Sequence, residues 1–248
     1  MQPRHERPVA LITGAGRRIG AVIARTLHAA GYDLALHYRH SADDARALAN
    51  ELEQQRSDST LLLQADLADT PTLAALIERL LKHYGRLDAL VNNASAFYPT
   101  PLGTATTTQW DELFASNAQG PFFLSQAAIP ALRETHGNIV NMIDIYAERP
   151  LAEHPLYCMA KAALAAMTRS LALDLSPDIR VNGIAPGAVL WPSDGKGHDD
   201  QRAMLARTPL QRAGSPDDVA STVLWLLRDT SVVTGQIIRV DGGRTQPV

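Results

Sequence analysis

Hydrophobic residues in this chain fall into short continuous runs, and longer segments with helical periodicity separate the runs. Continuous apolar runs bounded by turn residues are typical of strands that are buried on both faces of a sheet. The runs predict strands at 8–14, 33–39, 60–67, 87–95, 137–143, 179–187 and 235–243. The segments between them repeat hydrophobic residues every three or four positions, which is typical of amphipathic helices. They predict helices at 20–32, 41–55, 70–85, 108–132, 156–175 and 215–227.

Strands and helices alternate along the whole chain. This alternation predicts an α/β fold with a Rossmann-like, doubly wound parallel sheet and right-handed crossovers. No internal repeat, low-complexity tract or linker interrupts the pattern, so we expect residues 1–248 to form a single domain. The longest irregular stretch is 190–200, and long loops in compact domains are often lids. We therefore predict a substrate lid around 190–208.

Composition narrows the class of protein. The chain has 248 residues, 46% of them hydrophobic, which suits one large domain. A formal net charge of −3 gives no general attraction to nucleic acid. Cys158 is the one cysteine, so no intramolecular disulfide is possible. The first residues are polar and no apolar stretch reaches the roughly 18 residues that span a bilayer. We expect a soluble cytoplasmic protein with no nucleic-acid or membrane partner.

The turn after the first strand predicts a dinucleotide site. It reads TGAGRRIG, residues 13–20, and leads from a strand into a helix. Gly-rich turns of this kind place a pyrophosphate at the N-terminus of the helix. Gly14 and Gly20 bracket the turn, but Arg18 stands where the usual fingerprint has glycine. Arg18 is either a ligand contact or a solvated arginine at the helix start.

The end of the second strand indicates which dinucleotide is bound. NAD sites place an acidic residue here to bind the ribose 2′-hydroxyl. This chain has Tyr38, Arg39, His40 and Ser41 instead, and two cationic side chains with a hydroxyl suit a 2′-phosphate. We predict NADPH/NADP+ as cofactor, with a solvated basic turn as the alternative. Asp66 ends the third strand, where it can bind the adenine amino group or cap the next helix.

A tyrosine and a lysine share one face of the helix predicted at 156–175. Tyr157 and Lys161 are four residues apart, and the strand before this helix leads to Asp144. A nearby ammonium is expected to lower the pKa of a phenol. That would make Tyr157 a usable proton donor near neutral pH.

The order of these motifs resembles the short-chain dehydrogenase/reductase superfamily over nearly the whole chain. The matching motifs are TGxxxxxG at 13–20, NNAS at 92–95, Asn117, YxxxK at 157–161 and Pro186-Gly187. Three features resemble the pteridine reductases more closely: Arg18, the string NNASAFYPTPL at 92–102, and Asp144 where most of the superfamily has serine.

The resemblance implies roles for the candidate site residues. It implies that Arg18 reaches both the cofactor phosphate and the pterin, and that Phe97 stacks on the pterin. Cofactor-binding candidates are Gly14, Arg18, Ile19, Tyr38, Arg39, His40, Ser41, Asp66, Leu67, Asn93, Ala94, Ser95, Tyr157, Lys161, Pro186 and Gly187. Substrate-binding candidates are Arg18, Ser95, Phe97, Asp144, Tyr157 and Trp191, the last in the predicted lid. The family pattern reads His-Arg-Ser where this chain has Arg39, His40 and Ser41, so the side chain that grips the 2′-phosphate stays open.

Catalytic candidates are Asp144, Tyr157, Lys161 and Asn117. Tyr157 and Asp144 would relay a proton, Lys161 would position the cofactor ribose, and Asn117 would hold a water or backbone group that links Lys161 to solvent. The expected activity is NADPH-dependent reduction of a pterin C=N bond. Dihydrobiopterin-like dihydropterins are the first candidates, and biopterin, dihydrofolate and folate are further ones. The resemblance also implies a homotetramer, and we predict no metal site.

Two alternatives belong to other functional classes. The first is a carbonyl reductase that acts on a ketone, against which Asp144 and Phe97 argue. The second is a non-catalytic NADP(H) sensor that binds a partner protein. The intact pair of Tyr157 and Lys161 argues against the sensor.

Overall fold

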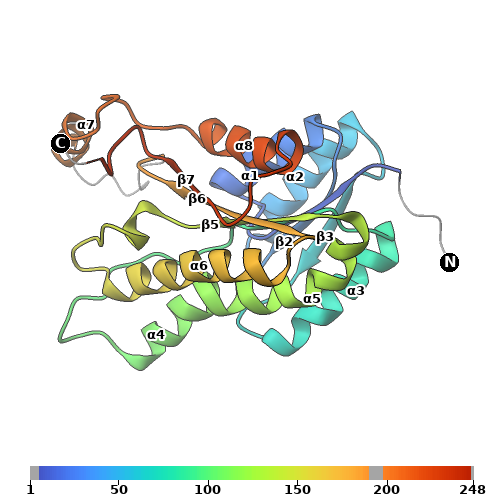
Figure 1. Ribbon diagram of the computed structural model, residues 1–248, viewed down its shortest axis with the longest axis horizontal. Coiled ribbons are helices and arrows are strands. Elements are labelled where there is room, and N and C mark those ends of the chain that lie inside the picture. The colour runs from blue at the N-terminus through green and yellow to red at the C-terminus, as the bar shows by residue number, and fades with distance from the viewer. Residues whose placement is uncertain (1–5, 190–197, 247–248) are drawn as a thin grey trace.

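The computed structural model describes residues 6–189 and 198–246, which form a seven-stranded parallel sheet between two layers of helices (Figure 1). The strands are β1 Val9–Ile12, β2 Asp33–Tyr38, β3 Thr60–Gln64, β4 Ala89–Asn92, β5 Asn138–Met142, β6 Arg180–Pro186 and β7 Ile237–Val240. Their order in the sheet is β3-β2-β1-β4-β5-β6-β7, and all neighbours are parallel. The predicted Rossmann-like α/β fold is confirmed.

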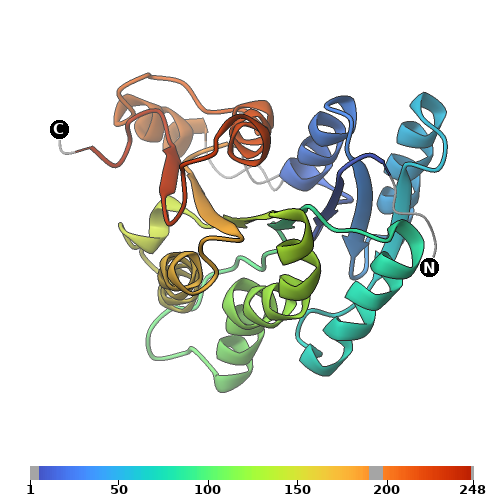
Figure 2. The same ribbon diagram turned by 45° about the vertical axis from the view of Figure 1, so that its right-hand side comes forward.

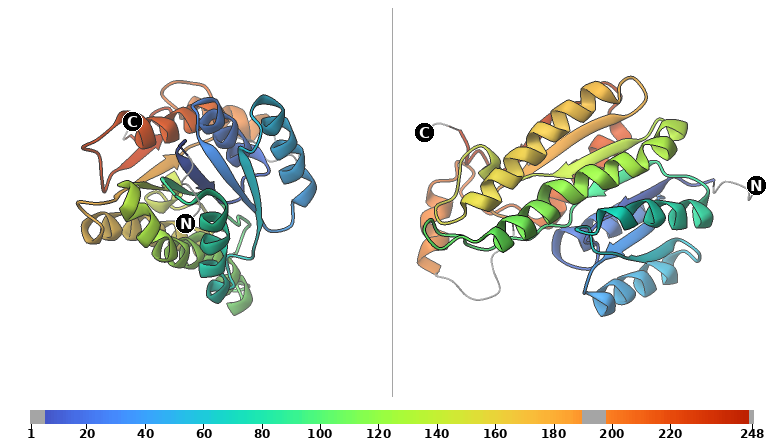
Figure 3. Two further views of the ribbon diagram at one scale, coloured as in Figure 1. Left: turned by 90° about the vertical axis from the view of Figure 1, so that its right-hand side faces the viewer. Right: turned by 90° about the horizontal axis from the view of Figure 1, so that it is seen from below.

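Helices cover both faces of the sheet (Figures 1 and 2). One layer contains α1 Arg18–Ala29, α2 Ala42–Gln55 and α8 Pro216–Leu224. The other contains α3 Leu73–Tyr84, α4 Thr107–Phe114, α5 Gly120–Thr135 and α6 Pro155–Asp174. Seen from below, α5 and α6 run side by side across the sheet (Figure 3). Helix α7, His198–Ala206, lies at one end of the molecule, next to the segment that follows β7 (Figure 1).

Alternate strand residues enter two separate apolar cores. Ala10 and Ile12 of β1 pack on the side of α1, α2 and α8, whereas Val9 and Leu11 pack on the side of α3, α5 and α6. Because both faces of the sheet are buried, every position of β1 and β2 is buried. This explains why the strands appear in the sequence as continuous apolar runs.

The chain reverses its direction across the sheet at β1. Strands β2 and β3 lie on one side of β1, and β4 returns to the other side. Ligands of open α/β sheets bind outside the carboxyl ends of the strands at such a reversal. Gly14 follows β1 and Asn93 follows β4, so both lie at this point.

Several predicted boundaries are wrong. The first helix begins at Arg18 rather than Gly20. The helix predicted at 108–132 is divided by a π-helical turn, Ala115–Gln119, and a second π-helical turn, Trp225–Asp229, follows α8. The stretch predicted to be irregular as far as residue 200 is already helical from His198. Residues 190–197, with Trp191, lie outside the described residues.

Within 6–189 and 198–246, no helix has the length and apolar character required to cross a membrane.

Candidate active site

Hydrogen bonds tie the turn after β1 to the end of β4. The Thr13 hydroxyl accepts from the backbone N–H groups of Asn93 and Ala94, both at 2.9 Å. The Asn93 side-chain amide donates to the carbonyls of Thr13 and Gly14, at 2.8 and 3.1 Å. The two predicted cofactor motifs thus form one rigid unit at the topological reversal.

The absence of a side chain at Gly20 allows the start of helix α1 to pack closely against the turn after β1 and against Asn93. A Cβ at Gly20 would lie 2.3 Å from the carbonyl oxygen of Gly14 and 2.6 Å from Nδ2 of Asn93, far inside van der Waals contact. Gly14 has φ +63° and a Cβ there would lie 3.0 Å from Cα of Ala94. Only glycine allows helix α1 to start this close to β1 and β4.

Arg18 has an unusual backbone conformation for its residue type. Its φ is +51°, in the left-handed region that side chains other than glycine rarely adopt. Its side chain is exposed at the first residue of α1. Non-glycine residues in this region are often found at ligand sites, where the surrounding structure holds them.

His37 is a structural member of this site that sequence reasoning missed. Its Nδ1 accepts from the backbone N–H of Gly14 at 3.3 Å, and its Nε2 donates to the carbonyl of Ala65 at 3.1 Å. These partners select one neutral tautomer. Burial lowers the pKa of His37 to about 4, although the bond to Ala65 and the charge of Asp66 oppose this shift. His37 therefore links the turn after β1 to the end of β3 as an uncharged side chain.

The ends of β2 and β3 carry the residues predicted to bind the adenosine half of the cofactor. Arg39 and Asp66 form an ion pair, with Nη2 and Oδ2 2.9 Å apart. Asp66 also accepts from the backbone N–H of Ala68 at 3.0 Å, so it stabilises the turn that follows β3. His40 is exposed, and Ser41 is only partly exposed, with its Oγ near Gly16.

This donor set fits an anionic dinucleotide. The first turn of α1 offers backbone N–H groups without intrahelical acceptors, and Arg18, Arg39 and His40 add exposed cationic or hydrogen-bonding groups. The other predicted cofactor residues line the same carboxyl edge but differ in exposure. The side chains of Tyr38 and Leu67 are buried and Ile19 is partly buried. Pro186 ends β6 and Gly187 follows it. When a nicotinamide dinucleotide is bound, it supplies or accepts the hydride.

The catalytic candidates meet at the ends of β5 and α6. The Tyr157 hydroxyl donates to Oδ2 of Asp144 at 2.8 Å, and the backbone N–H of Tyr146 donates to Oδ1 at 2.9 Å. Asp144 therefore both caps the turn after β5 and contacts the phenol. Buried Lys161 donates to the carbonyl of Met142 at 2.8 Å, and its Nζ lies 5.8 Å from the centre of the Tyr157 ring.

Burial is the largest influence on the pKa values of Asp144, Tyr157 and Lys161. It raises the pKa of Asp144 against the opposing effects of the Tyr146 and Tyr157 bonds and of Lys161 and Arg244. Burial and the neighbouring Asp144 raise the pKa of Tyr157 well above its usual value. The sequence predicted that Lys161 would lower the pKa of this phenol, and that expectation is wrong for this geometry. Burial also lowers the pKa of Lys161 to about 8.

Asn117 acts on neighbouring backbone groups. Its amide donates to the carbonyls of Ala96 and Leu113, both at 2.9 Å, and its Oδ1 accepts from the Ser95 hydroxyl at 2.6 Å. Ser95 also contacts the Tyr157 hydroxyl and opposes the rise of its pKa. Across the described residues, Asn117 makes no direct hydrogen bond to Lys161. Its position in the π-helical turn holds Ser95 beside Tyr157.

Phe97 forms an aromatic wall next to Tyr157. Its ring meets the Tyr157 ring edge-on at 4.8 Å and stacks on His154 at 4.7 Å, while half of its surface stays exposed. His154 immediately precedes α6 and was not singled out from the sequence. No local signal identifies it, because its contact with Phe97 exists only in the folded chain. A planar substrate can stack on the exposed part of Phe97.

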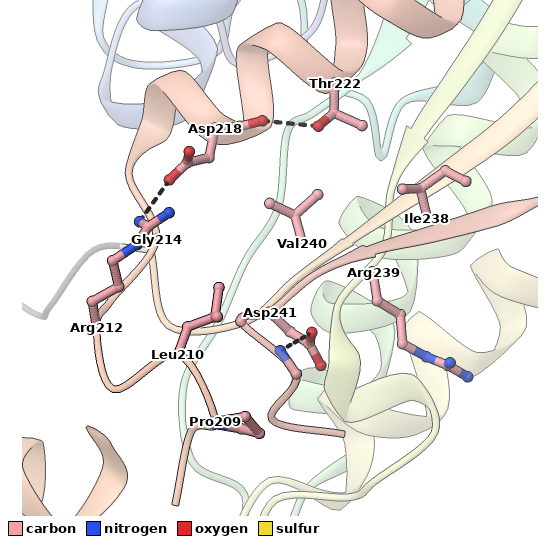
Figure 4. A pocket seen from close by; sticks show the side chains of 12 residues that line it. Pro209, Leu210, Arg212, Gly214, Asp218, Thr222, Ile238, Arg239, Val240 and Asp241 are labelled. Atoms are coloured by element: carbon pink, nitrogen blue, oxygen red, sulfur yellow. Dashed lines mark hydrogen bonds and ion pairs between the residues drawn. The ribbon is translucent and has the colours of Figure 1, made fainter. Parts of the chain in front are cut away.

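A separate hollow of about 580 Å³ lies beside the end of β7 and α8 (Figure 4). Leu210, Arg212, Ile238, Arg239 and Asp241 are among its lining residues. None of the predicted site residues lines this hollow. In the described part of the chain, no cluster of His, Cys, Asp and Glu side chains is arranged to hold a metal ion.

Comparisons with known proteins agree with this fold. A family model described as enoyl-(acyl carrier protein) reductase matches residues 14–245. The chain belongs to the short-chain dehydrogenase/reductase superfamily, and it is an oxidoreductase of the kind that uses NAD(P)(H).

Its relatives include enzymes named for two different substrates. Pteridine reductase 1 of Leishmania tarentolae is 39% identical over 277 aligned residues, covering 95% of this chain and 96% of the relative. A 3-oxoacyl-(acyl-carrier-protein) reductase of Staphylococcus aureus is 35% identical over 238 residues, covering 94% and 96%. Family membership alone therefore does not select the substrate.

Proposed function

We propose that this protein is an NADPH-dependent pteridine reductase. The observation that carries the proposal is the 2.8 Å hydrogen bond from Tyr157 to the buried carboxyl of Asp144. A carboxyl group can store a proton and return it, whereas a serine hydroxyl in its place can only orient a carbonyl substrate. The 39% identity to a pteridine reductase and the exposed ring of Phe97 support the same function.

The side chains suggest how the proton moves. In reduction of a pterin C=N bond, a hydride adds to carbon and the ring nitrogen takes one proton. The Tyr157 hydroxyl gives its proton to this nitrogen, and a protonated Asp144 replaces the proton on Tyr157. The raised pKa of Tyr157 keeps the phenol protonated before the reaction. The raised pKa of Asp144, caused mainly by burial, brings its protonated form closer to neutral pH.

The remaining residues position these groups. Lys161 is held by the carbonyl of Met142 and would orient the cofactor ribose. Arg18, Ser95 and Phe97 would bind the pterin, while Arg39, His40 and Ser41 would bind the 2′-phosphate. Ser95 and Phe97 follow β4, whereas Arg39, His40 and Ser41 follow β2 on the other side of β1. Arg18 follows β1 itself, between the two. Trp191 and the lid around 190–208 would close over the substrate. We also propose that the protein is cytoplasmic and forms a homotetramer.

A ketoacyl reductase is the main competing function, because a relative with 35% identity carries that name. Oxidation of NADPH should be measured with dihydrobiopterin, dihydrofolate, folate and a panel of ketones that includes a ketoacyl thioester. We expect turnover with pterins and little with ketones. Turnover of ketones alone would replace the proposal by a carbonyl reductase, and cofactor binding without any turnover would favour a sensor.

The same assay tests Asp144 directly. We expect Asp144→Ser to lose most pterin turnover, while NADPH affinity stays within about threefold, a change below roughly 1 kcal/mol. Melting temperatures of both proteins separate loss of folding from loss of activity. Full pterin turnover per folded Asp144→Ser molecule would contradict the proton relay.

A further inference from the structure

The segment that leads into α6 places a histidine against the ring of Phe97. His154 immediately precedes α6, and its imidazole stacks on the Phe97 ring with the ring centres 4.7 Å apart and an interplanar angle of 13°. Tyr157 contacts the same ring edge-on, at 4.8 Å between centres. Phe97 thus has two ring neighbours at the beginning of α6, and one of them is the candidate proton donor.

The imidazole of His154 has an anchor of its own. Its Nδ1 lies 2.8 Å from the carbonyl oxygen of Ala152. A carbonyl oxygen only accepts, so Nδ1 carries a proton and donates. The backbone N–H of His154 donates to the carbonyl of Leu151 at 3.3 Å, which closes a tight turn. The ring is therefore held in place by contacts that do not depend on Phe97.

The backbone before His154 is also held from outside the turn. Glu153 has φ +61°, in the left-handed region that residues other than glycine rarely adopt. Its carbonyl accepts from the backbone N–H of Thr100 at 2.6 Å, and the N–H of Leu151 donates to Sγ of Cys158 at 3.3 Å. Such conformations persist where neighbouring contacts hold them, and they cluster at ligand sites. The conformation of Glu153 sets the direction in which the chain reaches His154.

The loop that carries Phe97 is fixed on both sides of this residue. Ala96 and Tyr98 pack on the small apolar cluster at the start of α6. The Tyr98 hydroxyl donates to Oε2 of Glu112 at 2.9 Å. Phe97 itself stays half exposed, and the ring contacts found for it in the described part of the chain are those with His154 and Tyr157. Its backbone is therefore fixed by packing, whereas its ring depends on these two neighbours.

We propose that His154 is a positioning residue that holds the Phe97 ring in the orientation that a flat substrate requires. This inference rests on the proposed function, since the substrate concerned is the pterin. An exposed side chain changes rotamer rapidly, and ordering it during binding lowers affinity. Stacking on His154 orders the ring beforehand and leaves the exposed half of Phe97 for the substrate.

The effect should be selective for flat substrates. A pterin stacks its ring system on Phe97, whereas a ketoacyl chain has no flat ring to stack. NADPH does not depend on Phe97 in the proposed site. Loss of the imidazole should therefore weaken pterin binding and leave NADPH binding unchanged.

Three substitutions separate the ring of His154 from its hydrogen bond. His154→Ala removes both, His154→Asn keeps a donor for the Ala152 carbonyl, and His154→Phe keeps a flat ring. For the Ala and Asn variants, we expect KM for dihydrobiopterin, and its Kd for the NADP+-saturated protein, to rise about 3–10-fold, or roughly 0.6–1.4 kcal/mol. His154→Phe should stay within about twofold of the wild type, and kcat should change less than about threefold in all three.

His83→Ala is the matched control. His83 also contacts an aromatic ring, edge-on to Tyr84 at 4.4 Å, but it lies at the end of α3 that precedes β4. Its substitution should leave KM and Kd for dihydrobiopterin unchanged.

Several results would overturn the proposal. A lower KM in His154→Ala would mean that the imidazole competes with the substrate for Phe97. Wild-type values in His154→Asn would assign the role to the hydrogen bond rather than to the ring. Unchanged values in a folded His154→Ala that reduces pterins would refute the role of His154 and leave the proposed function intact. Failure of both the Ala and Asn variants to fold, judged by melting temperature, would restrict His154 to the fold.

NMR gives a readout that does not depend on turnover. The imidazole C–H protons of His154 lie against the face of Phe97, so the ring current should move their signals upfield, and Phe97→Leu should abolish this shift. His154→Asn identifies the signals. Absence of the shift in the wild type would overturn the proposal. The shift in a protein that neither binds nor reduces pterins would refute the proposed function and leave the positioning of Phe97 by His154 intact.

Discussion

Tyr157 and Asp144 show how a single contact changes the chemistry of a familiar pair of residues. A phenol beside a lysine is expected to become more acidic, yet Tyr157 lies in a buried site and donates to a carboxyl group. Burial and the carboxyl raise its pKa. Tyr157 is therefore a weak acid by itself, and in the proposed function Asp144 would return the proton that Tyr157 gives up.

Removal of the Tyr157 hydroxyl tests this view. We expect Tyr157→Phe to bind NADPH normally and to lose turnover by about 10²–10⁴-fold, the usual effect of a general acid. The phenyl ring keeps the edge contact with Phe97, so the melting temperature should change little. Near-normal turnover in steady-state kinetics would exclude Tyr157 from the mechanism.

Substitution of Arg39 tests whether the protein prefers NADPH to NADH. It forms a half-exposed ion pair with Asp66, which contributes little to stability and leaves the guanidinium accessible to a phosphate. Arg39→Asp should weaken NADPH binding by roughly 1.5–3 kcal/mol, the value of a charged hydrogen bond, and spare NADH.

Arg46→Asp is the matched control, because Arg46 is an exposed arginine on α2 that pairs with Asp43. It should leave both affinities unchanged. Binding of the two cofactors can be followed by fluorescence titration. Equal kinetics with NADPH and NADH in the wild type would refute the assignment of the 2′-phosphate site.

At the scale of elements, the site depends on how strand ends are joined. Thr13 and Asn93 connect β1 to β4, and His37 connects the β1 turn to β3. Behind them, the buried side chains of Asn92, Asn141 and Thr168 form a hydrogen-bonded chain across β4, β5 and α6. These links hold the carboxyl edge of the sheet in one geometry before any ligand binds.

The link that His37 forms between strand ends can be tested by measuring stability as a function of pH. The neutral side chain is required in the folded state, where its pKa is lowered to about 4, whereas an unfolded histidine titrates near about 6.5. The unfolded chain binds more protons between these values, so the contribution of His37 is complete above about pH 6.5 and is lost as the pH falls towards 4. The free energy of unfolding should fall by up to about 3 kcal/mol over this range.

His37→Gln is the comparison, because glutamine keeps a donor and an acceptor but does not titrate. Denaturant unfolding between pH 7 and pH 4, at about one-unit steps, should show a steeper decline for the wild type than for the variant. Parallel curves for the two proteins would contradict a neutral, buried His37.

At the scale of the whole molecule, one helical layer carries unusual exposed apolar residues. Trp110 on α4, Phe122 and Phe123 on α5 and Met159 on α6 are all exposed. Helices α4, α5 and α6 lie together on one side of the sheet (Figure 3). Large apolar side chains gathered in one layer are typical of a surface that another protein chain covers.

The proposed homotetramer would pair this layer across a two-fold axis. Gel filtration with light scattering should give the mass of four chains, and Phe123→Asp should yield smaller species because a charge would be buried in the interface. Val232→Asp is the control, since Val232 is exposed outside this layer and should not alter the mass. A monomeric wild-type protein would contradict the assembly.

The sequence alone determined the α/β class, most element positions and the residues that face the carboxyl edge. These features follow from local patterns, because buried parallel strands require continuous apolar runs and a tight βα turn requires glycine. The π-helical turns escaped prediction, since one extra residue per turn hardly changes the apolar periodicity. Helix α7 was missed because 198–206 has few apolar residues with a helical period.

Only the tertiary structure decided which groups act on one another. The sequence placed Lys161 near Tyr157, but burial and Asp144 reversed the expected shift of the phenol pKa. His154 and His37 became part of the site because packing joins residues that lie far apart in the chain. Proton affinity depends on solvent exclusion and on the charges within a few ångströms. Both are set by the arrangement of the helices and strands in space. The spacing of residues along the sequence does not specify that arrangement.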